Sequence, residues 1–255
     1  MKLLSGGCRV YSADDGQFST HGNWTARTVI SHNSGAQHIT QTVSDYASGI
    51  SPAVVNPGAE EVLYVASGVG KCRVNGFEYA LSTGTAIFVP PGAVYNIENT
   101  VAELLRLISS CCPEDPRRHI VDDPLPTASG QPPRLLVHED LRDDIRAGQD
   151  RLFRYLIYTD LGCKQITQFA GWIPPSKAPV HYHTYEEGIF VLEGHGIVHT
   201  DGESCEFAPG SSIYFPIGVH HCVENPGTST IKLLGAFYPS GSPGEAYERV
   251  KPKDG

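Results

Sequence analysis

The chain lacks the features that mark membrane proteins and nucleic-acid-binding proteins. No stretch reaches the roughly 18 consecutive apolar residues that a membrane-spanning helix needs. The N-terminal MKLLSGGC ends at a cysteine, but too few apolar residues precede it for a secretion signal. The formal net charge is -9, and no run of Lys and Arg is interleaved with aromatic residues. We therefore expect a cytoplasmic protein, with neither nucleic acid nor a membrane among its partners.

The seven cysteines also lack the C-x2-C spacing of a zinc or redox motif, which predicts ordinary reduced thiols. What the chain does contain is 40% hydrophobic residues together with 27 Gly and 19 Pro. This composition favours a β-rich globular protein with many tight turns. The length of 255 residues allows either one large domain or two small ones.

A repeat of turn residues favours two domains. In two parts of the chain a Glu is followed at fixed distances by Gly, Gly, Pro, Gly and Asn, and each position in the second part lies 126 residues after its counterpart. The positions are Glu61, Gly68, Gly84, Pro90, Gly92 and Asn99, and then Glu187, Gly194, Gly210, Pro216, Gly218 and Asn225. The apolar runs between them predict strands over residues 62–65, 86–89, 189–192 and 212–215, with hairpin turns at Gly68 and Gly194.

Four residues of the second copy could bind one metal ion. His181, His183 and Glu187 have the same parity, so in a continuous strand they would face one side of the sheet. His221 follows the turn at 216–218 and would lie on another strand, which in a closed barrel can face the first. Three imidazoles and one carboxylate suit a borderline divalent ion and leave open positions for a small-molecule substrate. We expect one Mn, Fe, Ni or Zn ion per chain.

These residues resemble the two motifs of the cupin superfamily. The matches are His181-x-His183-x3-Glu187-x6-Gly194 and Gly210-x5-Pro216-x-Gly218-x2-His221-x3-Asn225, and they cover much of the C-terminal half. One departure is Pro175, where the first motif often opens with glycine. The resemblance implies an all-β fold of two tandem cupin barrels, each a double-stranded β-helix or jelly roll.

The implied division of the chain places a degenerate N-terminal barrel with its extension in residues 1–112 and a metal-binding barrel in residues 151–255. Between them, residues 113–150 are rich in Pro, Asp and Arg and predict a linker with one short helix near 141–147. The first forty residues have weak periodicity and would wrap a neighbouring barrel or a second subunit.

The first copy keeps the turn residues but loses the metal donors. Tyr95 stands at the position of His221, while Val55 and Pro57 stand at those of His181 and His183. Because Glu61 alone cannot hold an ion, we predict a metal-free N-terminal barrel. Tyr95 would fill its core or hydrogen-bond a ligand.

Within the superfamily the architecture resembles the ureidoglycine aminohydrolase group, bicupins with a single manganese in the C-terminal barrel. That group has Glu and Gln in its metal set, whereas this chain has His181 and His221 at the matching places and Glu187 where the group has a histidine. The substrate of the group therefore does not carry over. The three-His, one-Glu set resembles instead that of cupin dioxygenases, decarboxylases, isomerases and lyases.

Three functions stay open at this point. The first is a metal-dependent hydrolase, isomerase or lyase acting on a small polar carbonyl, carboxylate or ureido compound. The second is an Fe(II)-dependent dioxygenase, and the third is a non-enzymatic protein that binds a small ligand. Exposed sheet faces or edges predict a homodimer.

Residues that would meet a substrate are less defined. Candidates for catalysis on the strands and loops leading to the site are Lys177, Gln165, Tyr155 and Arg154. The same residues would also serve as exposed strand-face groups. By parity His220 would face away from the metal donors, whereas Glu186, Tyr182 and Tyr185 would either line the pocket mouth or have ordinary structural roles.

Overall fold

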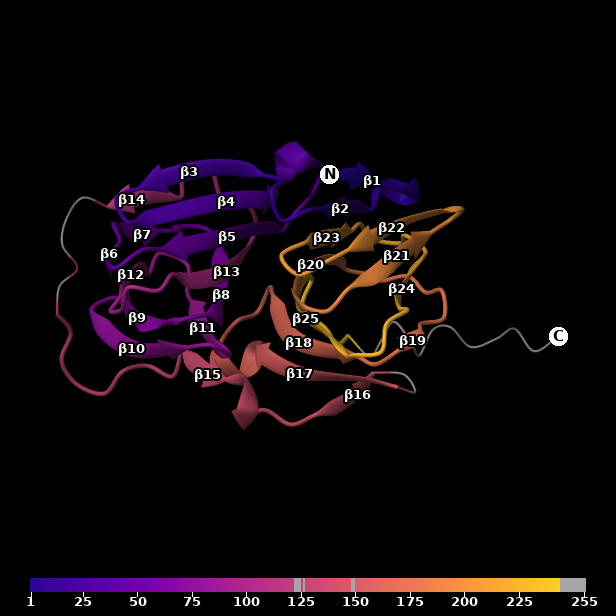
Figure 1. Ribbon diagram of the computed structural model, residues 1–255. Coiled ribbons are helices and arrows are strands. Elements are labelled where there is room, and N and C mark those ends of the chain that lie inside the picture. Colours follow the sequence, from indigo (N-terminus) through magenta and orange to yellow (C-terminus); the bar gives the residue numbers. More distant parts are fainter. Residues whose placement is uncertain (122–124, 126, 148–149, 244–255) are drawn as a thin grey trace.

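The computed structural model describes residues 1–121, 125, 127–147 and 150–243, and over these residues the chain is built almost wholly of β-strands (Figure 1). The helices of this part are four 3-10 turns: η1 (Ser5–Gly7), η2 (His32–Ser34), η3 (Glu139–Leu141) and η4 (Thr159–Leu161). None of the described helices has the length and apolar character needed to cross a membrane. The all-β prediction is confirmed.

The short helix predicted near 141–147 is wrong. Residues Ile145–Ala147 instead form strand β16, which pairs antiparallel with Arg151, Leu152 and Phe153. Leu, Arg and Ala favour a helix only weakly in a segment this short, and pairing with a neighbouring strand overrides that preference.

The N-terminal barrel consists of two sheets. The seven-stranded sheet has the order β15 (Leu136–His138), β11 (Thr85–Val89), β8 (Glu60–Ser67), β13 (Leu105–Cys112), β5 (Thr40–Tyr46), β4 (Trp24–Ile30) and β3 (Gln17–His21). The second sheet has the order β10 (Phe77–Ser82), β9 (Val69–Val74), β12 (Val94–Asn99), β7 (Ala53–Val55) and β14 (His119–Val121), with β6 (Gly49–Ile50) pairing with β12.

The C-terminal barrel repeats this plan. Its eight-stranded sheet has the order β1 (Lys2–Leu3), β2 (Arg9–Tyr11), β23 (Ser212–Phe215), β20 (Glu186–Glu193), β25 (Ile231–Tyr238), β18 (Thr167–Ile173), β17 (Arg151–Ile157) and β16. Its four-stranded sheet has the order β19 (Ser176–Lys177), β24 (His221–Asn225), β21 (Gly196–Thr200) and β22 (Glu203–Phe207).

The strands predicted from the repeat are confirmed, since the four apolar runs lie within β8, β11, β20 and β23. Gly68 and Gly194 occupy the hairpin turns with φ values of +96° and +85°. This left-handed region is open to glycine at little steric cost, which explains why both copies have the same residue there.

Each barrel is extended at one edge of its repeat by a strand from outside that repeat, here called an edge strand (Figure 1). Strand β2, near the N-terminus, pairs with β23 of the C-terminal barrel. Strand β15, from the segment between the barrels, pairs with β11 of the N-terminal barrel. The expectation that the N-terminal residues wrap a neighbouring barrel is thus confirmed. The described part of 113–150 also adds β14 to the N-terminal sheets and β16 to the C-terminal one, and the exact domain limits stay a prediction.

The largest hydrophobic core is shared by both barrels. It joins residues of the N-terminal sheets, such as Val62 and Ile87, to residues of β17 and β25, such as Leu156 and Leu234. The interior of the C-terminal barrel forms a separate core, and a small aromatic cluster beside it includes Phe153 and Phe169. This arrangement fixes one barrel against the other and leaves the C-terminal interior to hold the candidate site.

Candidate metal centre

Two of the four predicted metal donors are paired directly through their backbones. The N–H of His181 donates to the carbonyl oxygen of His221 at 3.0 Å, and the N–H of His221 donates to the carbonyl oxygen of His181 at 2.8 Å. Residues that exchange both hydrogen bonds lie opposite each other in an antiparallel ladder, so their side chains point to the same face. The bridge therefore brings both imidazoles into one space, with ring centroids 4.7 Å apart.

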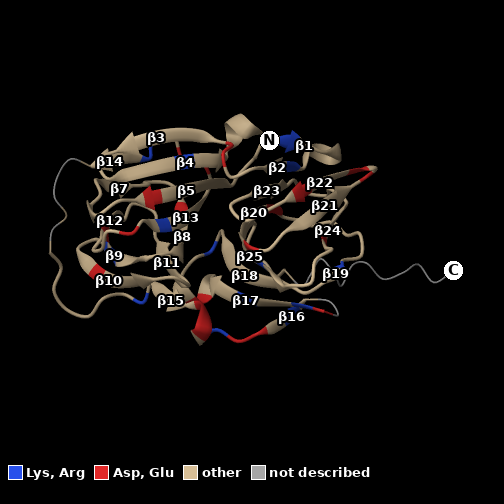
Figure 2. Cartoon of the chain, in the orientation of Figure 1, with Lys and Arg blue, Asp and Glu red and all other residues tan. Residues whose placement is uncertain are grey.

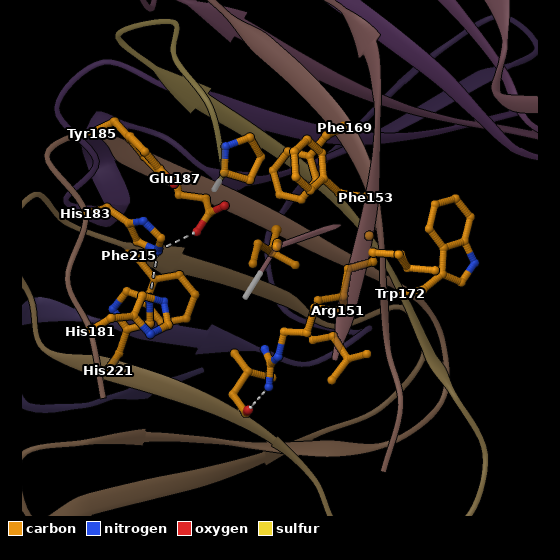
Figure 3. Close-up of a pocket in the computed structure, with 18 residues that line it drawn as sticks. Arg151, Phe153, Phe169, Trp172, His181, His183, Tyr185, Glu187, Phe215 and His221 are labelled. Atoms are coloured by element: carbon orange, nitrogen blue, oxygen red, sulfur yellow. Dashed lines mark hydrogen bonds and ion pairs between the residues drawn. The ribbon is translucent and has the colours of Figure 1, made fainter. Parts of the chain in front are cut away.

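His183 and Glu187 join this pair although the strand does not run continuously through them. The described chain has strand β19 at 176–177, the isolated bridge at His181 and then strand β20 from Glu186. The backbone N–H of Gly218 donates to the carbonyl oxygen of His183 at 2.9 Å, which ties this irregular segment to the turn before His221. The four donors still converge. His183 Nε2 lies 3.0 Å from His221 Nε2 and 3.4 Å from a carboxylate oxygen of Glu187 (Figure 3).

Backbone carbonyl groups orient two of the rings. Nδ1 of His181 lies 2.9 Å from the oxygen of Pro179, and Nδ1 of His221 lies 2.8 Å from the oxygen of Val219. Because a carbonyl oxygen can only accept, each Nδ1 carries the proton and each Nε2 keeps its lone pair. Aromatic contacts hold the rings further: Phe215 stacks on His221 at a centroid distance of 3.9 Å. Such outer contacts are typical of histidines that bind metal through Nε2.

The four side chains are buried in surroundings that disfavour charge. Burial lowers the pKa of His181, lowers that of His183 well below its usual value and lowers that of His221 to about 3. Burial raises the pKa of Glu187 to about 8. Neutral imidazoles beside a buried carboxyl group fit a borderline divalent cation, since each imidazole offers a lone pair and the cation would stabilise the carboxylate. Among the described residues, His181, His183 and His221 form a cluster whose donor atoms lie within 4.8 Å of one another.

These donors line a small pocket with mostly apolar walls (Figure 3). The cavity volume is about 80 Å³, enough for a few water molecules or a small ligand. The apolar and aromatic lining includes Phe153, Phe169, Trp172, Ile173, Ile189, Phe215 and Leu233. Besides the four predicted metal donors, the lining includes the polar side chains of Arg151 and Tyr185.

The candidates for catalysis lie elsewhere. The side chain of Arg154 binds Asp144 and Asp140 in the acidic segment around η3 (Figure 2) and covers the ring of Trp172. Lys177 is about half exposed and pairs with Glu224 at 3.1 Å. None of Lys177, Gln165, Tyr155 and Arg154 is among the described residues that line the pocket. Their catalytic role stays a prediction.

Gln165 and Tyr155 have other surroundings. The backbone N–H of Gln165 donates to Glu60 of the N-terminal barrel at 2.7 Å. The ring of Tyr155 packs edge-on against Phe153 with a centroid distance of 5.1 Å. His220 is exposed, in line with its predicted direction away from the donors.

Sequence reasoning missed Arg151. The first three residues of β17, Arg151, Leu152 and Phe153, line the pocket, and Arg151 has the same parity as the buried Phe153. The available signal was the parity of an arginine relative to an apolar neighbour two residues on. Tyr185 is buried against His183, with ring centroids 4.5 Å apart, so of its two predicted settings it takes the pocket wall.

A known protein family matches the chain in both barrels. The family model described as Cupin domain matches residues 45–111 and 172–237, more than half of the chain. The chain belongs to the cupin family. Because the model matches twice, once in each barrel, this cupin is a bicupin, as its resemblance to the family implied.

Curated relatives match this bicupin over short segments. It is 40% identical over 65 residues to the uncharacterized protein MJ1618 of Methanocaldococcus jannaschii, covering 25% of this chain and 52% of that protein. It is 39% identical over 54 residues to mannose-1-phosphate guanylyltransferase of Salmonella montevideo, covering 21% of this chain and 11% of the enzyme. The chain thus spans about half or less of the length of these relatives.

Solved structures share the fold of the whole bicupin. Protein Ylba from E. coli has a TM-score of 0.73 at 17% identity over 93% of both chains. A mutant of oxalate decarboxylase OxdC from Bacillus subtilis has a TM-score of 0.75 at 14% identity, covering 95% of this chain and 79% of that one. The putative glyoxylate induced protein from Pseudomonas aeruginosa has a TM-score of 0.72 at 18% identity, covering 94% and 92%. At these identities the likeness is one of fold.

Proposed function

We propose that this bicupin is a metal-dependent enzyme that holds one divalent transition metal ion through His181, His183, Glu187 and His221. The observation that carries the proposal is the convergence of three buried imidazoles and one buried carboxyl group at one wall of a mostly apolar pocket. A bound ion of this class supplies a Lewis acid that polarises a carbonyl or carboxylate oxygen. The backbone bridge and the carbonyl groups of Pro179 and Val219 keep the donors oriented for it.

The substrate is a small carbonyl or carboxylate compound with an apolar body. An oxygen-bearing group suits the metal, while the small cavity and the aromatic walls suit a compact apolar remainder. A ureido compound fits less well, because its several N–H groups need acceptors and the described side chains of the lining offer few apart from Glu187. The reaction is of the hydrolase, isomerase or lyase type.

An Fe(II)-dependent dioxygenase is the second candidate, and the lining itself favours it. The pocket walls are rich in aromatic rings, which suit an aromatic or diketone substrate. Oxygen uptake by iron-loaded protein distinguishes the two candidates, because the first needs no dioxygen. Binding without turnover under any metal would leave a non-enzymatic ligand-binding protein.

The test of the metal site is metal content measured by elemental mass spectrometry. We expect near-stoichiometric metal in the wild type and loss of most of it in His183→Ala, with the fold retained because the barrels rest on hydrophobic burial. The matched control is His195→Ala, since His195 is exposed and outside the pocket lining. Equal metal content in His183→Ala and wild type would contradict the proposal, and the metal found selects anaerobic lyase assays or oxygen-uptake assays.

A further inference from the structure

Arg151 places a buried positive charge in the wall of the metal pocket. It is 7% exposed and begins strand β17, and the next two residues of this strand, Leu152 and Phe153, also line the pocket. In Figure 3 its side chain reaches from β17 toward the side of the pocket that carries the histidines. Arg151 and His181 both line this pocket.

The hydrogen bonds of this guanidinium are incomplete. One terminal nitrogen, Nη2, donates to the carbonyl oxygen of Val223 at 2.7 Å. Among the described residues Nε has no hydrogen-bond partner, and the carboxylate of Asp150, which is 43% exposed, lies 3.9 Å from it. A guanidinium has five N–H donors, and a buried cation is stable only when its charge and donors are matched. The Nε–H of Arg151 is therefore left to donate to an anionic acceptor, beside the long ion pair with the partly exposed Asp150.

The hydrogen bond to Val223 also fixes the guanidinium group of Arg151 near the strand that carries His221. Val223 is on β24 two residues after His221, so the carbonyl group that orients Arg151 and the imidazole that would hold the metal belong to one strand. Both groups line the same cavity of about 80 Å³. A single small molecule can therefore contact both at once.

We propose that Arg151 binds the carboxylate group of the substrate, which makes the substrate a small apolar carboxylic acid. This inference rests on the proposed metal-dependent function and names its substrate class. The planar guanidinium fork matches the two oxygens of a carboxylate, and charge-assisted hydrogen bonds are strongest where water is excluded. The aromatic walls provide that exclusion and contact the apolar remainder of the acid.

The test measures binding rather than turnover. Isothermal titration calorimetry on the metal-loaded protein uses acetate, benzoate, pyruvate and phenylpyruvate as probes, with neutral benzamide as the matched uncharged ligand. We expect Arg151→Gln to weaken binding of the tightest acid about tenfold or more and to leave the weak binding of benzamide unchanged. Arg151→Lys keeps the positive charge but lacks the planar fork of the guanidinium. Its affinity for the acid should therefore lie between those of the wild type and Arg151→Gln.

A buried arginine outside the pocket provides the matched control. Arg27 is 6% exposed and donates to the backbone oxygen of Asp15 at 2.6 Å, so Arg27→Gln removes a comparable guanidinium without touching the site. This variant should bind the acids as the wild type does. Should Arg151→Gln fail to fold, Arg151→Lys and the comparison of benzoate with benzamide on the wild type still decide.

Two results would overturn the inference: failure of all four acids to bind the wild type, or equal affinity in the wild type and Arg151→Gln. The metal content of the same samples distinguishes failure of the proposed metal site from failure of carboxylate binding by Arg151. Stoichiometric metal without carboxylate binding leaves the proposed function standing and removes the role of Arg151. If the protein binds no metal but binds carboxylates through Arg151, the role of Arg151 stands and the proposed metal-dependent function does not.

Discussion

In the N-terminal barrel, the guanidinium of Arg118 meets the residues that correspond to the metal donors. Arg118 Nη2 lies 3.4 Å from a carboxylate oxygen of Glu61 and 3.1 Å from the hydroxyl oxygen of Tyr95. Tyr95 is buried and donates to the same carboxylate at 3.0 Å, so of its two predicted roles the core position applies. Glu61 corresponds to Glu187 and is fully buried. Here a side chain of the protein balances the carboxylate for which we propose a metal ion in the other barrel.

Substituting Arg118 tests whether this pairing stabilises the barrel. We expect Arg118→Met to lower the free energy of unfolding by about 3 kcal/mol, because Glu61 then lacks its cation while the Arg118 side chain was itself one-third exposed. Adding Glu61→Gln should restore most of the loss. The measurement is the urea midpoint of both single variants and the double variant. Additive effects in the double variant would contradict the coupling.

At the scale of elements, the exchanged edge strands show what the sequence could and could not reveal. The repeat at 126 residues predicts the strands inside each barrel, because Gly and Pro mark their turns. The three-residue strands β2 and β15 lie outside the repeat, and their partners lie in the other half of the chain. Their pairing is set by which edge is open, which is a property of the folded barrels.

The same distinction holds for the site. Spacing and the resemblance to the cupin motifs predicted the four metal donors, and the structure brings their side chains together. The break of the strand between His181 and Glu187 was not predicted, since it depends on a backbone contact with Gly218. Arg151 was missed for a related reason: which face of β17 looks into the pocket depends on barrel geometry rather than on local pattern.

Matched substitutions in the two edge strands test their contribution. Val10 of β2 and Val137 of β15 are 4% and 6% exposed and pair with β23 and β11 respectively. We expect Val10→Ala and Val137→Ala each to lower the free energy of unfolding by roughly 1–3 kcal/mol through lost burial and a residual cavity. Val69→Ala is the control, since Val69 is 44% exposed. Denaturant unfolding measures all three, and equal effects at Val69 and Val10 would argue against a stabilising edge strand.

At the scale of the whole molecule, two buried glutamates join the barrels reciprocally. Glu60 of the N-terminal barrel accepts from the backbone N–H groups of Lys164 and Gln165 at 2.7–3.0 Å. Glu186 of the C-terminal barrel accepts from the backbone N–H groups of residues 37–39 at 2.8–3.2 Å. Together with the exchanged edge strands and the shared core, these contacts make one barrel part of the fold of the other. The predicted homodimer stays a prediction.

Replacing one acceptor oxygen of either glutamate should lower the stability of both barrels together. Glu60→Gln and Glu186→Gln keep the size of the side chain but replace one acceptor oxygen by an NH2 group facing N–H donors. We expect each to lower the free energy of unfolding by about 1.5–3 kcal/mol, since hydrogen bonds to a buried charge are lost. The control is Glu78→Gln, because the side chain of Glu78 is 45% exposed. The measurement is urea unfolding followed by circular dichroism and intrinsic fluorescence.

The number of transitions in the unfolding curve shows whether the two barrels unfold together. If the reciprocal contacts bind the barrels into one cooperative unit, the single variants keep one transition at a lower midpoint, and the double variant loses about the sum of both effects. Two separated transitions in the double variant would mean that the glutamates alone hold the barrels together and that the edge strands and shared core do not suffice. Unchanged midpoints in both single variants would mean that a neutral amide replaces each carboxylate at no cost, and the charge of the glutamates would then have no part in joining the barrels.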